Sequence, residues 1–286
     1  MSGVNIRLDV RSTMPEIAKA IDEMGRQGRF AMAVALTRTA QDVRKAEREE
    51  MQKVFDRPTP YTLNSLYVAG ATKEQMQARV WLKDELAVSN GGTPATKYLL
   101  PQIEGGGRAL KGLERMMERI GALPKGWRVV PGQGASVDGY GNMSRSQVIQ
   151  ILSYFQAWNL SGLEANNSTA ATRARLAKGT KKRAGVSYFV SRGRTDDRAR
   201  HLHAGVWQRV GKWRLKPVLL FVPRVSYRRR FDFQGVAEKV ILARFAVHFE
   251  VAAERAMRSA WTDAQRAGFT VRSQAVTAGT LAWRQG

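Results

Sequence analysis

Cysteine is absent from this sequence. Its absence excludes disulfide frameworks, zinc sites built from cysteine thiolates and enzymes with a thiol nucleophile. No apolar run approaches the ~18 uninterrupted residues that predict a membrane-spanning helix, and residues 1–10 lack the apolar centre of a secretory signal. We therefore expect a soluble protein made in the cytoplasm, with no membrane among its partners.

Acidic residues are scarce relative to basic ones. The chain of 286 residues has 24 Asp and Glu against 47 Lys and Arg, a net charge of +23, and its pI is near 11. Its hydrophobic content of 43% is close to that of an ordinary globular protein, so wholesale disorder is not expected. The length suits one large domain or two modest ones. Such a charge favours nucleic acid or acidic protein surfaces as partners and suits a freely diffusing enzyme poorly.

Most of this charge lies in one segment. Residues 173–230, which we call the basic block, hold 18 Lys and Arg residues and only two acids, Asp196 and Asp197, for a net charge of +16. Unpaired buried charges are too costly, so the block must form a surface, either for a polyanion or for an acidic neighbour in an assembly. Eight residues are the predicted contacts to nucleic acid or an acidic partner: Arg173, Arg175, Lys178, Lys181, Lys182, Arg183, Arg192 and Arg194.

Hydrophobic periodicity predicts an α+β fold. Apolar residues at helical spacing predict one long helix over 28–54 and an alanine-rich one over 235–268. Alternating or continuous apolar runs predict five strands, over 65–70, 77–83, 186–190, 204–210 and 214–222. We expect the strands of 65–83 and 186–222 to form an antiparallel sheet that packs against the two long helices.

The middle of the chain has a different texture. Helical patterns occupy residues 94–103 and 110–120, and the glycine-rich segment 126–142 is expected to be a long loop. Ser144 and Gln147 have the spacing of a capping box and predict the start of a further helix. The predicted organisation is an N-terminal helix and β-hairpin (1–89), a mainly helical insertion (90–160), and a basic mobile loop (161–182), strands and the long C-terminal helix that complete the main domain (161–286).

One cluster has metal-ligand chemistry. His201 and His203 share a face if they lie on a strand, and Asp196 and Asp197 are near them in sequence. Two polar residues at the entry to a strand are the favoured interpretation. No serine–histidine–aspartate set and no paired-carboxylate motif can be assembled. We expect no enzyme activity, no metal site and no cofactor.

Two tryptophans lie among the basic residues of the block. Trp207 and Trp213 have the aromatic surface on which nucleic-acid bases stack. Apolar neighbours, among them Val206 and Leu215, favour a packing role for both instead.

Two stretches together resemble a known family. The run Ala31–Ala40, the segment Arg57–Pro60 and the strand Ala78–Asp84 resemble the start of the minor tail protein Z family of tailed phages and prophages. The run Ala204–Val210, with the strand and helix that follow it, is similar to that family's second half. The likeness covers about half of the chain, at its two ends, and departs from the family over 90–160.

The resemblance implies a structural role. Proteins of this family are tail-completion or neck components, assembled as a ring at the head-proximal end of the tail. Applied to this chain, it implies a virion protein made in the host bacterial cytoplasm. The implied partners are further copies of itself, other tail or head–tail connector proteins, and genomic DNA. The resemblance carries no catalytic residues with it.

Three other functions remain open. A stand-alone nucleic-acid-binding protein would bind free DNA with a steep salt dependence. A metal-dependent phage nuclease would use the histidines and aspartates named above, although only two acids lie in the basic block. A scaffolding-like assembly factor would be absent from finished virions.

Overall fold

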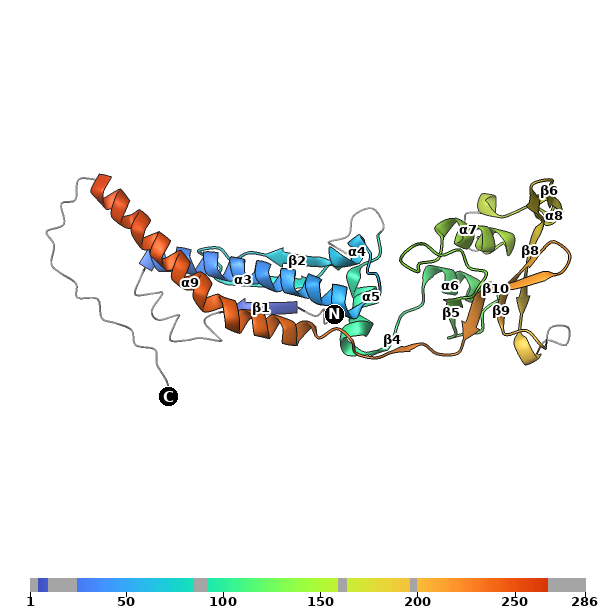
Figure 1. Cartoon of the computed structure of the whole chain (residues 1–286), viewed down its shortest axis with the longest axis horizontal. Helices are drawn as coiled ribbons and strands as arrows, with labels where there is room; N and C mark the ends of the chain where they lie inside the picture. Colours follow the sequence, from blue (N-terminus) through green and yellow to red (C-terminus); the bar gives the residue numbers. More distant parts are fainter. Residues whose placement is uncertain (1–4, 10–24, 85–91, 159–163, 196–199, 267–286) are drawn as a thin grey trace. The chain divides into compact units, whose positions relative to one another are not determined.

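The computed structural model describes residues 5–9, 25–84, 92–158, 164–195 and 200–266. The fold is α+β with antiparallel sheets, as predicted (Figure 1). The described residues divide into two compact units. The long-helix unit comprises Asn5–Ala46, Val68–Trp81 and the described residues from Ala237 onward, and the sheet unit comprises Glu47–Tyr67 and Leu82–Val236.

The long-helix unit is built around two helices and a small sheet. It contains all or most of β1 (Asn5–Asp9), α3 (Gly25–Val54), β2 (Leu66–Ala69), β3 (Gln77–Leu82) and α9 (Phe233–Arg266). The strand order is β1-β3-β2, and β1 pairs antiparallel with β3. Met32, Leu36 and Val43 of α3 pack with Val80 of β3 and Phe245 of α9 in one buried cluster. Both predicted long helices are confirmed, and this sheet packs against them.

Small residues let α3 and α9 approach each other closely. Ala31 of α3 packs with Ala252, Ala253 and Ala256 of α9 in a buried cluster. A polar contact between α9 and α3 adds to this, because His248 Nε2 lies 2.7 Å from Asp42 Oδ2. Alanine is also the strongest helix former, so the same residues favour the long helix and its close packing.

The sheet unit holds the remaining elements. Its helices are α4 (Pro60–Leu63), α5 (Ala95–Glu104), α6 (Gly112–Arg119), α7 (Arg145–Tyr154) and α8 (Ala170–Lys178), with short 3-10 turns η1 (Glu164–Asn166) and η2 (Gly193–Thr195). Its strands are β4 (Gly106–Gly107), β5 (Arg128–Pro131), β6 (Gly179–Thr180), β7 (Arg183–Ala184), β8 (Val186–Ser191), β9 (Gly205–Val210), β10 (Arg214–Val222) and β11 (Ser226–Tyr227). Met117 of α6 and Ile151 of α7 are buried against Val206 and Leu219 of the sheet.

The expectation of one shared sheet is wrong. The strands of 186–222 form a four-stranded sheet in the order β5-β10-β9-β8, separate from the sheet that contains β2 and β3. Each sheet also contains one strand that local patterns did not predict. One is β5, inside the expected loop 126–142, which pairs antiparallel with β10, and the other is β1, which pairs with β3.

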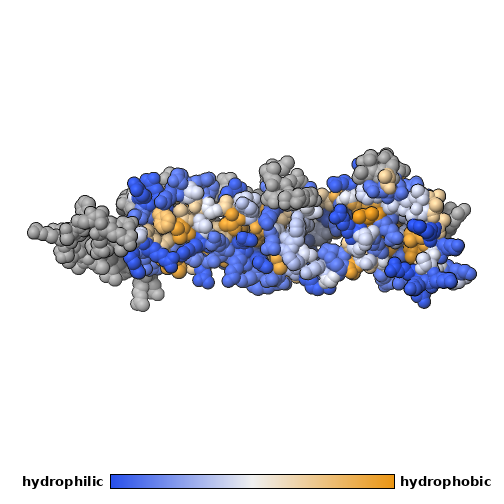
Figure 2. Space-filling view, turned by 90° about the horizontal axis from the view of Figure 1, so that it is seen from above, coloured by the Kyte–Doolittle hydropathy of each residue, from blue (hydrophilic) through white to orange (hydrophobic). Residues whose placement is uncertain are grey.

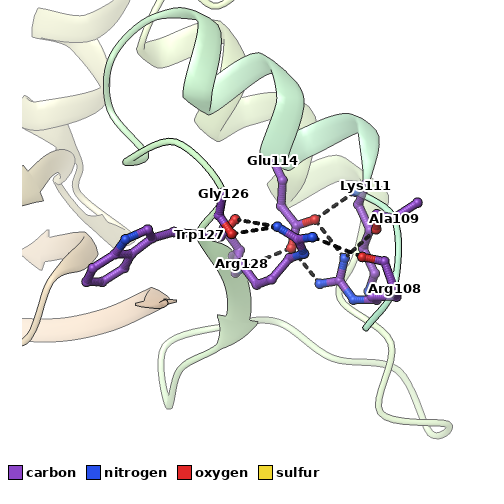
Figure 3. Close-up of polar contacts among 8 residues, drawn as sticks. Arg108, Ala109, Lys111, Glu114, Gly126, Trp127 and Arg128 are labelled. Atoms are coloured by element: carbon purple, nitrogen blue, oxygen red, sulfur yellow. Dashed lines mark hydrogen bonds and ion pairs between the residues drawn. The ribbon is translucent and has the colours of Figure 1, made fainter. Parts of the chain in front are cut away.

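A buried ion pair fixes α6 to β5 (Figure 3). Arg108 Nη1 donates to Glu114 Oε2 at 2.7 Å, and Arg108 Nη2 donates to Oε1. Glu114 also accepts from the backbone N–H groups of Lys111 (2.7 Å) and Val129 (2.8 Å). Burial alone raises the pKa of Glu114, but the Arg108 guanidinium and the two N–H groups outweigh it and hold the pKa below its usual value. Because Val129 lies in β5, the carboxylate ties the helix to the sheet.

Candidate nucleic-acid interface

The segment expected to be a basic loop is largely a helix. Residues 170–178 form α8, so the prediction of a loop over 161–182 is wrong there. The Thr169 hydroxyl caps the helix by accepting from the Thr172 N–H at 3.1 Å. Alanine, arginine, lysine and leucine fill most of α8 and are strong helix formers, a preference that the charge of the segment obscured. A two-residue hairpin, β6–β7, follows the helix and pairs Thr180 with Arg183.

Gly185 lets α8 lie directly against the start of β8. A Cβ atom at this buried position would overlap with the carbonyl group of Ala177 in α8. Backbone cannot move away as a flexible side chain does, so any larger residue here must push the helix off the strand. The position of α8 therefore depends on a glycine at 185.

Gly185→Ala is expected to destabilise the protein by about 2 kcal/mol and to loosen α8. Thermal melts and amide hydrogen exchange of α8 would measure the two effects. Gly139→Ala is the matched control, because no heavy atom lies within 4 Å of a Cβ built at Gly139 and the variant should melt as the wild type does. Equal melting temperatures for the two variants would contradict this account of α8.

An open groove lies beside α8 in the sheet unit. Its volume is about 1160 Å³, and α7, α8, the β6–β7 hairpin and β8 line it. Arg175 of α8 and Arg183 of β7 are the only charged residues among its described lining residues. The other polar groups are hydroxyls and amides, from Ser136, Ser144, Ser146, Gln147, Gln150, Ser153, Ser168, Thr172, Thr180 and Gln208, together with the phenol of Tyr188.

This lining suits an anion. Two guanidinium groups without an acidic neighbour in the lining give a positive field, and hydroxyls and amides offer hydrogen bonds to phosphate oxygens. The Tyr188 hydroxyl donates to Gln150 Oε1 at 3.2 Å. Burial raises the pKa of this phenol above its usual value. The groove can therefore hold a phosphate chain through its two guanidinium groups and its neutral hydrogen-bonding groups.

The structure brings five of the eight predicted contact residues together. Arg175 and Arg183 line the groove, and three exposed lysines follow on the same helix and hairpin. We call these five residues with the groove the basic interface: Arg175, Lys178, Lys181, Lys182 and Arg183. They lie within nine consecutive residues, on an α-helix and the tight hairpin that follows it.

The other three predicted residues lie elsewhere. Arg173 is half-buried, and its Nη1 donates to the Ser168 carbonyl at 3.1 Å, so it holds the chain before α8. Arg192 and Arg194 are exposed and follow the far end of β8. Since β8 has six residues, this end is about 17 Å along the strand from the end that adjoins Arg183. The eight residues therefore lie at three places: the basic interface, the other end of β8 with Arg192 and Arg194, and the contact of Arg173 with the chain before α8.

Sequence reasoning missed the uncharged half of the groove. The helix predicted to start at Ser144 is confirmed as α7, with Ser144 at its N-cap, but the capping box is wrong because Ser144 makes no capping hydrogen bond. Gln147 instead accepts from the Ser136 N–H at 2.6 Å and donates to the Gly134 carbonyl at 3.1 Å, which holds the preceding loop against α7. The polar residues at 146, 147, 150 and 153 share one side of a helix, and this pattern could have predicted a polar surface on that side.

The two tryptophans differ. Trp207 is 9% exposed and donates from Nε1 to the His203 carbonyl at 2.9 Å, so its predicted packing role is confirmed. The same prediction is wrong for Trp213, which is 90% exposed in the turn between β9 and β10. Apolar neighbours along a strand do not bury a side chain when the residue stands at the turn.

The described residues around His201 and His203 do not support a metal site. His201 and His203 are exposed and precede β9, and Asp196 and Asp197 lie outside the described residues. Over the described ranges, no group of three or more His, Cys, Asp or Glu side chains is placed to hold a metal ion. The expectation that the chain is not an enzyme stays a prediction.

Among the described residues, no helix is both long enough and apolar enough to cross a membrane. Comparison with protein-family models, with curated proteins and with solved structures gives no match to this chain.

Proposed function

We propose that this chain is a structural subunit of a tailed-phage particle, a tail-completion or neck component that contacts the genome through its basic interface. The observation that carries the proposal is the groove lined by Arg175 and Arg183 with no acid among its described lining residues. A passive DNA contact needs such positive, hydrogen-bonding surface and no catalytic group. The resemblance of the two ends of the chain to the minor tail protein Z family supports the placement in the particle.

A second observation supports assembly from several copies. Four large apolar side chains of α9 are exposed: Leu242, Val247, Val251 and Met257. Leu242 is 72% and Met257 is 54% exposed, and Figure 2 shows hydrophobic residues at the surface over the part of the chain that holds the long helices. Exposed large apolar side chains favour burial against another protein. In a ring, these residues of α9 would contact a different surface of the neighbouring copy.

The test is the composition of particles made by the phage or prophage that encodes the chain. We expect mass spectrometry of purified particles to find several copies per particle. Replacing both Leu242 and Met257 with serine is expected to abolish incorporation, because it removes apolar area from the subunit contact. Arg244→Ser changes an exposed residue of the same helix and should be incorporated normally.

Absence of the wild-type chain from mature particles would overturn the proposal and favour a scaffolding-like factor. A chain that binds DNA as a monomer and never enters particles would favour the stand-alone nucleic-acid-binding protein. The basic interface favours that second candidate equally well, since it needs no neighbouring subunit to bind a phosphate chain.

A further inference from the structure

The turn between β9 and β10 carries an exposed indole. Trp213 is 90% exposed, and Lys212 and Arg214 on either side of it are exposed too. Tryptophan is usually buried to a large extent, because its apolar area is the largest of any side chain. The turn does not need the indole, since Gly211 provides the left-handed backbone conformation with φ +62°. The fold therefore gives Trp213 no packing role.

This turn adjoins the basic interface. Val210, the last residue of β9, pairs with Val186, the first residue of β8, and the Gly211 N–H donates to the Gly185 carbonyl at 2.8 Å. Gly185 follows the β6–β7 hairpin directly. Figure 1 accordingly draws the β9–β10 turn and the β6–β7 hairpin at the same end of the four-stranded sheet. The exposed indole and the groove belong to one end of one sheet.

The charge around the indole is of one sign. Arg209, Lys212, Arg214 and Lys216 are exposed on the β9–β10 hairpin, and the lysines of the β6–β7 hairpin lie at the same end. Phosphate contacts fix the path of a nucleic-acid strand, and an aromatic face holds a base by stacking. The combination of a phosphate-binding groove and an exposed aromatic side chain at its end is what a strand with unpaired bases requires.

We propose that the β9–β10 turn and the basic interface together bind single-stranded nucleic acid, with Trp213 stacking on an unpaired base while Arg175 and Arg183 hold the backbone in the groove. This inference rests on the proposed role of the groove as a phosphate contact and goes further by naming the form of nucleic acid. An unpaired strand is favoured because its bases expose their faces, whereas in a duplex each base is covered by its neighbours.

An anionic membrane is the main competitor, since tryptophan and lysine also occur at membrane interfaces. Two features argue against it. A surface-binding element buries several apolar side chains, and Trp213 stands between two charged residues at this turn. The hydroxyls and amides line a concave surface, which suits a flexible strand better than a flat layer of headgroups.

Binding of the full-length protein to a labelled 12-nucleotide oligo-dT strand and to the matching dT·dA duplex tests the proposal. Each would be measured by fluorescence anisotropy at several salt concentrations. The informative variants are Trp213→Ala, the aromatic replacement Trp213→Phe, and the double variant Arg175→Ala/Arg183→Ala. Arg244→Ala on α9 is a control that removes one exposed positive charge far from the site in sequence.

Trp213→Ala is expected to weaken binding to the single strand about tenfold, the loss of one stacked base, and to change duplex binding by less than about twofold. Trp213→Phe should keep most of the affinity because it keeps an aromatic face. The double arginine variant should weaken binding to both forms and reduce the slope of log affinity against log salt by about 1.4 for the single strand. Arg244→Ala should leave the preference for the single strand unchanged.

Equal loss of single-strand and duplex binding in Trp213→Ala would overturn the stacking role. Tighter binding to vesicles of phosphatidylserine and phosphatidylcholine than to oligo-dT, lost in Trp213→Ala, would overturn it in favour of a membrane. The outcome is separable from the proposed function. Single-strand binding by a chain that is absent from particles would support this inference and overturn the phage assignment. A chain that is present in particles but shows no preference for the single strand would support the phage assignment and overturn this inference.

Discussion

Replacing Glu114 with alanine is expected to lower the free energy of unfolding by about 3–5 kcal/mol. Its carboxylate is fully buried and accepts hydrogen bonds from the Arg108 guanidinium and from the N–H groups of Lys111 and Val129 (Figure 3). Removing it leaves a nearly buried positive charge and two backbone donors without their acceptor. The loss should be visible in urea unfolding followed by circular dichroism.

Two further variants test whether the loss of stability comes from this ion pair rather than from removing any carboxylate of α6. Glu118→Ala removes a carboxylate of the same helix that accepts a single backbone hydrogen bond, from the Gly126 N–H, and should cost no more than about 1.5 kcal/mol. Replacing both Arg108 and Glu114 with leucine should cost less than Glu114→Ala alone, because no uncompensated charge remains. If the double variant is the least stable of the three, the destabilisation does not come from the stranded guanidinium.

The same ion pair predicts sensitivity to acid. Because the folded protein holds the pKa of Glu114 below its usual value of 4.5, the carboxylate contributes stability that is present above pH 4.5. This contribution is lost as the pH falls below 4.5 toward the lowered pKa. The affected elements are α6 and β5, and β5 is the partner strand of β10 in the sheet that carries the basic interface.

Periodicity predicted both long helices and the strands β2, β3, β8, β9 and β10, and it missed β1 and β5. Ala33, Ala40 and Val43 recur at helical spacing over several turns and are buried, so α3 was visible in the sequence. Strand β5 has four residues in a glycine-rich stretch, and only Val129 among them is buried. Its backbone hydrogen bonds come from β10, which is far away in the sequence, and no local pattern records such a partner.

The sequence predicted the charge of the candidate site but not the groove that its residues line. Arg175 and Arg183 were predicted from composition, because a charged block has to lie on a surface. Their convergence on one groove follows from the close contact of α8 with Gly185, a tertiary feature. Trp213 was misassigned for a related reason, since its burial depended on where the turn between β9 and β10 falls.

Glu47 is expected to make the protein less stable as the pH rises. Its side chain is fully buried in α3, and neither carboxylate oxygen has a hydrogen-bond partner. Burial, together with the smaller effect of the negative charges of Asp232 and Glu50, raises its pKa to about 9. The folded protein therefore keeps Glu47 protonated at pH values where the unfolded chain has released the proton.

The sign follows from proton binding. Between pH 4.5, the ordinary pKa of a glutamate, and about 9, the folded state binds one more proton than the unfolded state. The free energy of unfolding then falls by about 1.4 kcal/mol for each pH unit across this window, and the contribution is fully present only below pH 4.5. Denaturant unfolding at pH 5, 6.5 and 8 would measure the slope.

Glu47→Met should remove this slope and raise the stability at pH 8 by at least about 2 kcal/mol, because methionine fills similar volume without an ionisable group. The gain should shrink toward pH 5, where wild-type Glu47 is protonated in the folded protein at little cost. Glu49→Gln alters an exposed carboxylate two residues away and should keep the wild-type slope. A gain of the same size at pH 5 and pH 8 would mean that Glu47 destabilises the fold by poor packing, with no part played by its proton.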